Sequence, residues 1–174
     1  MQSERLNAGI GTLRTFTGQY INVVSPDPDT IDIFDIAHHL SLINRWCGAS
    51  EEGISVAQHS IIVAELIDGP PKIKLCGLLH DATEAYMQDL PSPIKALFSA
   101  YITVEYHLMS VIAKKFGLQY PFPDEIKIKD RKVLEIEWKS IILQEICDIG
   151  IVPMSAKEAE AAFLNMYYEL NNNT

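Results

Sequence analysis

Long apolar runs and cysteine are both scarce in this 174-residue sequence. No stretch approaches the roughly 20 consecutive apolar residues that span a bilayer, and the start of the chain has no apolar run like that of a signal peptide. The cysteines, Cys47, Cys76 and Cys147, are odd in number and far apart. This pattern excludes a disulfide framework and favours reduced thiols in a core. We therefore expect a soluble, cytoplasmic protein with no membrane partner.

Positive charge is scarce as well. Lys and Arg together number 14 against 23 Asp and Glu, which gives a formal net charge of −9. Grooves that bind nucleic acid rely on clustered Lys and Arg, so we expect no nucleic-acid partner. An anionic small molecule is still compatible with this charge if a bound cation, or a few well-placed Arg and Lys side chains, supply local positive potential.

Hydrophobic periodicity predicts helices through most of the chain. Residues 15–24 instead predict a small β-hairpin around Gly18, which Pro26 and Pro28 terminate. The predicted helices cover about 35–48, 55–67, 72–86, a short segment from 94, 99–116, 124–148 and 155–170. No repeat or shift in composition marks a second domain. We expect one domain, with an all-α bundle over residues 31–174 and an N-terminal extension over 1–30 packed on it.

A histidine and a carboxylate stand side by side at His80-Asp81, inside an apolar segment. Such groups are costly to bury unless they are paired, and a metal ion is a common partner. His59 lies on the apolar stripe of one predicted helix and Asp130 on that of another, so three helices direct candidate ligands inward. Two imidazoles and two carboxylates suit Mn, Co, Fe or Zn. The absence of a thiolate favours a catalytic site over a structural zinc site.

Each of these residues also has a purely structural interpretation. A lone histidine such as His59 on an apolar stripe is more often a hydrogen-bonded core residue, and Asp130 could be a salt-bridged acid. The convergence of inward-facing polar residues on three helices favours a metal site instead. A bound divalent ion would activate a water molecule and polarise a phosphoryl oxygen. Glu84 could orient or deprotonate that water or hold a proton, and Asp89 could do the same or protonate the leaving oxygen.

The pattern resembles the H…HD…D signature of HD-domain metal-dependent phosphohydrolases, a family with an all-α fold. The similarity runs from about residue 35 to 145. It is closest to the bacterial 5′-deoxynucleotidases of the YfbR type and the phage deoxynucleotide hydrolases of that group. The segments that carry it are Ile43-Asn44-Arg45-Trp46, Ser55-Val56-Ala57-Gln58-His59-Ser60, His80-Asp81-Ala82-Thr83-Glu84 and Asp89-Leu90-Pro91-Ser92-Pro93-Ile94-Lys95.

The resemblance implies a chemical role for each residue of the signature. The implied metal ligands are His59, His80, Asp81 and Asp130. The implied cofactor is a divalent ion, with Mn, Co or Zn favoured and Mg also compatible. The resemblance further implies that Glu84 and Asp89 assist water attack and departure of the leaving group.

Three more residues match substrate contacts of the family. Arg45 matches an arginine near the substrate phosphate, for which its planar fork is suited. Trp46 matches an aromatic residue against the sugar, where it could penalise a ribose 2′-hydroxyl, although it could equally be a core residue. Lys95 matches a lysine that reaches phosphates in the phage relatives, although it could also be a solvated residue at a helix start.

These expectations combine into a functional hypothesis. We expect a hydrolase that releases phosphate from small-molecule deoxynucleoside 5′-monophosphates by means of metal-activated water. The first alternative is a deoxynucleoside triphosphate hydrolase, for instance one that acts on dATP. More distant alternatives are a phosphodiesterase of cyclic or alarmone nucleotides and a non-catalytic HD scaffold. Relatives form dimers or larger rings, so we expect a homo-oligomer.

Overall fold

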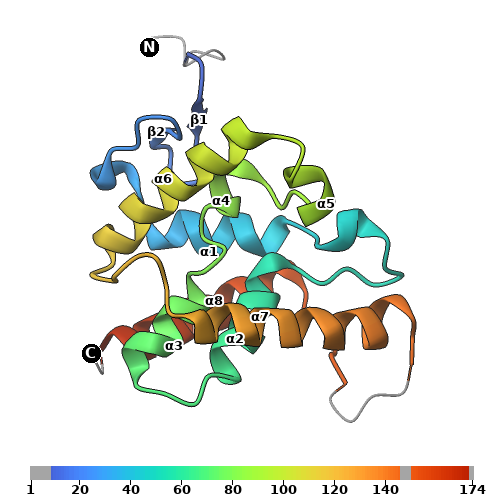
Figure 1. Cartoon of the computed structure of the whole chain (residues 1–174). Helices are drawn as coiled ribbons and strands as arrows, with labels where there is room; N and C mark the ends of the chain where they lie inside the picture. The colour runs from blue at the N-terminus through green and yellow to red at the C-terminus, as the bar shows by residue number, and fades with distance from the viewer. Residues whose placement is uncertain (1–8, 146–149, 173–174) are drawn as a thin grey trace.

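A computed structural model describes residues 9–145 and 150–172 of the chain. Within these residues the strands form one antiparallel hairpin and the other regular elements are helices (Figure 1). Strands β1 (Thr12–Arg14) and β2 (Tyr20–Asn22) pair with Leu13 opposite Ile21. The predicted all-α class with a short N-terminal hairpin is therefore confirmed.

The helices follow the hairpin, and proline, glycine and polar capping residues mark several of their ends. They are α1 (Ile33–Leu42), α2 (Val56–Glu65), α3 (Pro71–Leu78), α4 (Glu84–Met87), α5 (Ser92–Lys95), α6 (Ser99–Lys115), α7 (Asp124–Glu137) and α8 (Ala156–Asn172). Short 3-10 turns occur at Pro28–Thr30 and Trp46–Gly48, and a π-helical turn at Trp138–Ile142 follows α7 directly. Among the described residues no helix is both long and apolar enough to cross a membrane.

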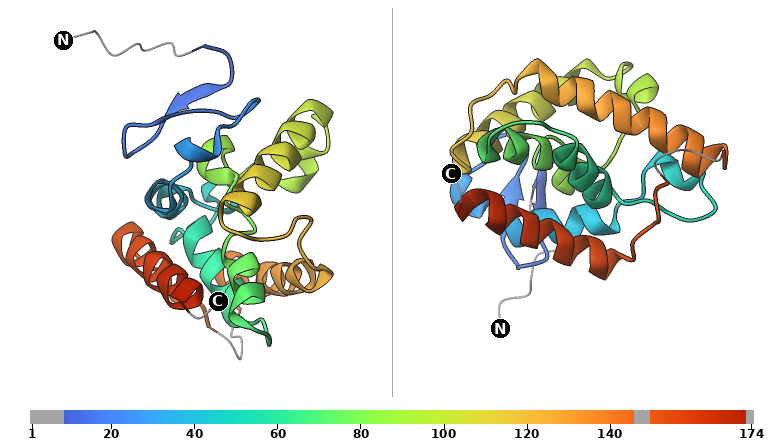
Figure 2. Two further views of the ribbon diagram at one scale, coloured as in Figure 1. Left: turned by 90° about the vertical axis from the view of Figure 1, so that its left-hand side faces the viewer. Right: turned by 90° about the horizontal axis from the view of Figure 1, so that it is seen from below.

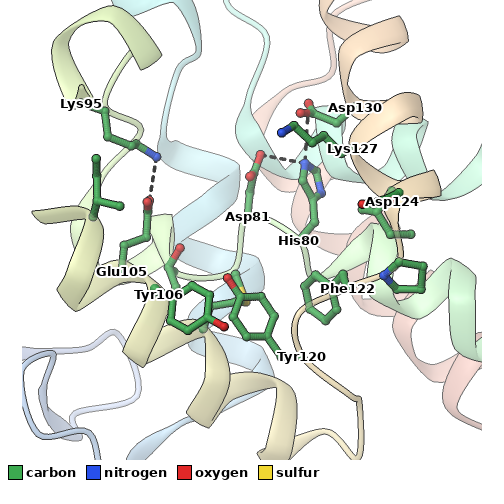
Figure 3. A pocket seen from close by; sticks show the side chains of 15 residues that line it. His80, Asp81, Lys95, Glu105, Tyr106, Tyr120, Phe122, Asp124, Lys127 and Asp130 are labelled. Atoms are coloured by element: carbon green, nitrogen blue, oxygen red, sulfur yellow. Dashed lines mark hydrogen bonds and ion pairs between the residues drawn. The ribbon is translucent and has the colours of Figure 1, made fainter. Parts of the chain in front are cut away.

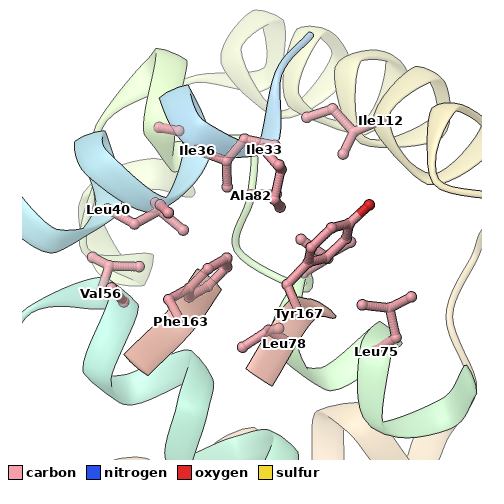
Figure 4. Close-up of a cluster of buried hydrophobic side chains, with 14 of the residues drawn as sticks. Ile33, Ile36, Leu40, Val56, Leu75, Leu78, Ala82, Ile112, Phe163 and Tyr167 are labelled. Atoms are coloured by element: carbon pink, nitrogen blue, oxygen red, sulfur yellow. The ribbon is translucent and has the colours of Figure 1, made fainter. Parts of the chain in front are cut away.

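The core lies where α1, α2, α3 and α8 meet. Helix α8 buries side chains spaced three or four residues apart, which are Ala159, Phe163, Tyr167 and Leu170. Phe163 lies near Leu40 of α1, Val56 of α2 and Leu78 of α3, and the Tyr167 ring points toward Ile112 of α6 (Figure 4). Seen from below, α2 and α3 lie between α7 and α8 (Figure 2). This arrangement places α7 beside the two helices that carry or precede the histidine motifs.

Helices α2 and α3 approach each other closely at Gly77. A methyl group on Gly77 would lie 3.3 Å from Cα of Ala64 and would collide with the side chain of Ile67. The missing side chain therefore permits the close contact between the helix that carries His59 and the helix that precedes His80.

Several predicted helix ends are confirmed at the residue level. Ser155 and Glu158 form the expected capping box, in which the Ser155 N–H donates to Glu158 Oε2 at 2.9 Å. Helix α6 ends as predicted before Gly117, whose φ of +66° is the left-handed conformation typical of a glycine beyond a C-terminus.

The predicted helix over 72–86 is wrong in its second half. Helix α3 ends at Leu78, and the chain then makes tight turns until α4 begins at Glu84. In these turns the Ala82 N–H donates to Leu79 O at 3.1 Å and the Glu84 N–H donates to Asp81 O at 2.9 Å. The His80-Asp81 doublet therefore lies in a turn between two helices.

The predicted helix over 35–48 is too long. Helix α1 ends at Leu42, because the next residues pair with a segment farther along the chain. The Val56 N–H donates to Ile43 O at 3.0 Å, and the Arg45 N–H donates to Ile54 O at 2.9 Å. Cys47 follows in the exposed turn at Trp46–Gly48, so the prediction of a core thiol is wrong for Cys47, whereas Cys76 is buried as predicted.

The predicted helix over 124–148 is divided between α7 and the π-helical turn. The end of that prediction, residues 146–149, lies outside the described residues, and so does Cys147.

Candidate functional site

Three structural segments bring two histidines and two aspartates together. His59 lies in the middle of α2 and is 0% exposed, His80 and Asp81 lie in the turn after α3, and Asp130 lies on α7. Asp130 Oδ1 is 3.1 Å from His59 Nε2 and 3.8 Å from His80 Nε2. Asp81 Oδ2 is 3.1 Å from His80 Nε2 and 3.7 Å from His59 Nε2. The four residues predicted as metal ligands are thus neighbours in space.

The backbone orients the imidazole of His80. Its Nδ1–H donates to Gly77 O at 2.7 Å, which leaves Nε2 facing Asp81 and Asp130. The buried Nε2 atom lies 3.1 Å from Asp81 Oδ2 and 3.8 Å from Asp130 Oδ1 (Figure 3). A metal ion held between this nitrogen and the two carboxylate oxygens would satisfy all three groups.

The ionisation of the carboxylates fits a cation site. Burial alone would raise the pKa of Asp81, but the charge and hydrogen bonding of His80 outweigh it and lower that pKa to about 2. The pKa of Asp130 lies well below its usual range, because hydrogen bonds from His59 and His80 outweigh its burial. These carboxylates in turn raise the pKa of His80. His59, His80 and Asp130 offer ligand atoms that all lie within 4.8 Å of one another and could hold a metal ion.

Asp81 and Asp130 of the candidate cluster border a pocket of about 610 Å³, a size typical of sites for small molecules. Glu84 and Asp89, the predicted catalytic residues, also line this pocket. Burial and the nearby charges of Asp81 and Asp89 raise the pKa of Glu84 to about 10, and its Oε2 atom has no hydrogen-bond partner among the described residues. Glu84 therefore holds a proton at neutral pH when no metal is bound. Burial raises the pKa of Asp89 as well, against the opposing charge of Arg45.

The predicted substrate residues line the same pocket. Arg45 is 8% exposed, and its NH1 atom lies 3.9 Å from Asp81 Oδ2. Trp46 is partly exposed at the pocket wall. Lys95 also lines it, but its Nζ is 2.7 Å from Glu105 Oε1, so much of its charge is already neutralised.

A second pocket of about 400 Å³ lies next to the metal candidates and shares Asp81, Lys95 and Asp130 with the larger pocket (Figure 3). Its wall carries three aromatic rings packed on one another, from Tyr106, Tyr120 and Phe122. Lys127, one turn before Asp130 on α7, also lines it.

The structure adds one residue for which the sequence predicted no role in the site. Glu137, at the end of α7, accepts hydrogen bonds from His59 Nδ1 at 2.7 Å, Arg45 Nε at 2.9 Å and Trp46 Nε1 at 3.1 Å. Its position seven residues after Asp130 placed it on the inner stripe of the predicted helix. An acidic residue on a stripe that faces the core was the signal in the sequence that could have identified Glu137 as part of the site.

The sequence of this chain is similar to those of several bacterial proteins. No protein-family model matches it. The YfdR protein of Escherichia coli is 35% identical over 133 residues, which cover 76% of this chain and 74% of YfdR. A protein of Rhodobacter capsulatus is 35% identical over 122 residues, covering 66% of this chain and 62% of that protein.

A more distant relative carries a functional name. The 5′-deoxynucleotidase of Citrobacter koseri is 30% identical over 125 residues, which cover 60% of this chain and 62% of that protein. This distant similarity points toward the HD-type phosphohydrolases, as the motifs did. With 35% identity over about three quarters of both proteins, the chain belongs to the family of the Escherichia coli protein YfdR.

Proposed function

We propose that this protein is a metal-dependent phosphohydrolase that releases phosphate from deoxynucleoside 5′-monophosphates. One observation supports the proposal most strongly: Asp81 and Asp130 of the candidate metal cluster line the same pocket as Arg45 and Glu84. The distant similarity to a 5′-deoxynucleotidase supports the same reaction class.

Each group in or beside the pocket is proposed to have a chemical role. A divalent ion held by His59, His80, Asp130 and Asp81 would polarise the phosphoryl group and lower the pKa of a bound water. Arg45 is placed to bind the phosphate oxygens, because a guanidinium presents a planar fork of N–H donors.

Two carboxyl groups complete the proposed chemistry. Glu84 is buried beside Asp81, and its carboxyl group can orient the attacking water or exchange a proton with it. Asp89 lines the same pocket, and burial raises its pKa, so it can protonate the leaving 5′ oxygen. Trp46 is proposed to contact the sugar from the pocket wall.

Phosphate release from panels of dNMPs and dNTPs tests the proposal directly. The assay is run with Mn²⁺, Co²⁺, Zn²⁺ and Mg²⁺ in turn, and products are separated by chromatography. We expect inorganic phosphate and a deoxynucleoside from at least one monophosphate. No turnover of either panel with any of these metals would contradict it. If elemental analysis also found no bound metal, a non-catalytic scaffold would be favoured.

The second pocket favours a second candidate, a deoxynucleoside triphosphate hydrolase. Lys127 and Lys95, the latter already paired with Glu105, line space adjacent to Asp81 and Asp130 that could admit the further phosphates of a longer substrate. The same assay separates the two candidates, because a triphosphate hydrolase yields tripolyphosphate or pyrophosphate from dNTPs and leaves monophosphates intact.

The proposal includes a homo-oligomeric assembly, which the resemblance of the motifs implies. Light scattering coupled to size-exclusion chromatography measures the mass directly. A mass equal to the 19.5 kDa of one chain would contradict this part of the proposal.

A further inference from the structure

One buried carboxylate joins the candidate metal centre to the candidate substrate pocket. Glu137 is 0% exposed, and its three hydrogen-bond partners come from two other segments. One oxygen, Oε1, accepts from His59 on α2. The other, Oε2, accepts from both Arg45 and Trp46 in the segment after α1.

The chemistry of these partners requires an ionised carboxylate. Arginine and the indole nitrogen can only donate hydrogen bonds, and His59 donates from Nδ1 when its Nε2 atom is the metal ligand. Donors therefore approach both oxygens of Glu137. Burial alone would raise the pKa of Glu137, but the hydrogen bond and charge of His59, together with Arg45, lower it below its ordinary value. A glutamine of the same shape would present an amide N–H to one of these donors.

On the metal side, Glu137 fixes the tautomer and orientation of His59. A carboxylate behind a metal-ligating imidazole keeps the proton on the far nitrogen and makes the near nitrogen a stronger ligand. The 2.7 Å contact between His59 Nδ1 and Glu137 Oε1 has this arrangement, since His59 Nε2 is the atom that faces Asp81 and Asp130.

On the substrate side, Glu137 holds a turn with an uncommon backbone. Trp46 and Cys47 have φ values of 58° and 51°, in the left-handed region that residues other than glycine seldom adopt. Such conformations persist only where surrounding contacts enforce them. The bonds from Glu137 to Arg45 and Trp46 fix the two consecutive side chains at the start of this turn.

We propose that Glu137 is a positioning residue that sets both the metal affinity of His59 and the placement of Arg45 and Trp46 against the substrate. This inference rests on the proposed function for its substrate side. Its metal side depends only on the ligand cluster. Because one rigid group serves both, disturbing it weakens metal binding and nucleotide binding together.

The direct test compares Glu137→Gln with Glu135→Gln, a change of the same kind on the exposed face of the same helix. Calorimetric titration with Mn²⁺ measures metal affinity. Quenching of tryptophan fluorescence at saturating Mn²⁺ by the non-hydrolysable phosphonate analogue of dAMP measures nucleotide affinity, called dAMP affinity below, because dAMP itself would be hydrolysed during the titration. For Glu137→Gln we expect metal affinity to fall by about 10- to 100-fold, the scale seen when the partner of a ligating histidine is lost. The dAMP affinity should fall as well, whereas Glu135→Gln should match the wild type in both titrations.

Two outcomes would overturn the inference. If a folded Glu137→Gln protein bound Mn²⁺ as tightly as the wild type, Glu137 would not set the metal affinity of His59. If Mn²⁺ affinity fell but dAMP affinity at saturating Mn²⁺ did not change, Glu137 would not position Arg45 and Trp46 for the substrate. Neither titration requires turnover, so a failure of the proposed hydrolysis is seen separately in the phosphate-release assay.

Further measurements apply if Glu137→Gln does not fold. Trp46→Phe removes the indole N–H together with the five-membered ring, and Arg45→Lys removes the Nε–H together with the guanidinium fork, with Glu137 left in place. Each should weaken dAMP binding while Mn²⁺ affinity stays within about two-fold of wild type. In the Zn²⁺-loaded wild type, nitrogen-15 NMR of histidine should find the proton of His59 on Nδ1. Unchanged dAMP affinity in both variants, or a proton on Nε2 of His59, contradicts the proposal.

Discussion

Asp35 on α1 accepts two hydrogen bonds from Thr17, one from the backbone N–H at 2.7 Å and one from the hydroxyl at 2.8 Å. These bonds attach the turn of the N-terminal hairpin to the buried face of α1. A second attachment runs through His39, which accepts from the Phe16 N–H at 3.1 Å and contacts Ala85 O at 2.7 Å. The hairpin is thereby connected to α4, next to Glu84.

Replacing Asp35 with alanine should destabilise the protein by about 1–2 kcal/mol, because both Thr17 donors lose their charged acceptor. Chemical denaturation measures the change in the free energy of unfolding. Asp29→Ala is the control, since the Asp29 side chain is 96% exposed and its contact with Lys115 spans 3.9 Å. Equal stability of the two variants would show that the Thr17 bonds add nothing.

Asp81→Ala should abolish phosphate release while the helical circular dichroism spectrum is retained. Asp81 faces both histidines of the cluster, and its side chain is not part of the apolar core. Asp68→Ala serves as the control, because the Asp68 side chain is 97% exposed. Wild-type turnover by Asp81→Ala would show that the metal assignment is wrong.

Trp46→Ala should reduce the preference for deoxyribonucleotides over ribonucleotides. The ring lines the pocket beside Arg45, and the loss of one specific pocket contact changes discrimination by about ten-fold. The measurement is the ratio of kcat/KM for dAMP and AMP. If this ratio is the same in the variant and the wild type, Trp46 has only a packing role.

The metal-free protein should lose thermal stability as the pH rises from about 6 to about 9. The folded pKa values of Glu84, about 10, and of His80 are raised above the ordinary values of 4.5 and 6.5. A raised folded pKa stabilises the protein below the ordinary value, and this contribution is lost as the pH climbs toward the folded value. Glu84→Gln is neutral at every pH, so its melting temperature should vary less over this range. An identical slope for the variant and the wild type would contradict the raised pKa of Glu84.

The sequence predicted the inward faces of the site better than its local backbone. Helical periodicity placed His59 and Asp130 on buried stripes, and both histidines and both aspartates are neighbours in the structure. The break after Leu78 has no proline to signal it. It accompanies a contact from the His80 ring to Gly77 O, which local propensity cannot reveal.

The same limit applies to the substrate segment. Arg45 was expected on a helix, but its backbone pairs with Ile54, a contact that depends on the whole fold. Glu137 stood on the predicted inner stripe, yet its partners lie more than 70 residues away in sequence. Periodicity assigns a residue to a face but does not identify the residue across from it.

In both imidazoles of the cluster the Nδ1 atom, which faces away from the candidate metal position, is hydrogen-bonded: His80 to Gly77 O and His59 to Glu137. A centre built in this way is rigid before any ion arrives, unlike zinc modules that fold only around their metal. Chelation with EDTA should therefore leave a folded protein, and adding the ion back should restore activity within the mixing time, with no refolding delay. One divalent ion should therefore replace another without a refolding step, and the affinities and the cellular supply of the ions would decide which of them occupies the site.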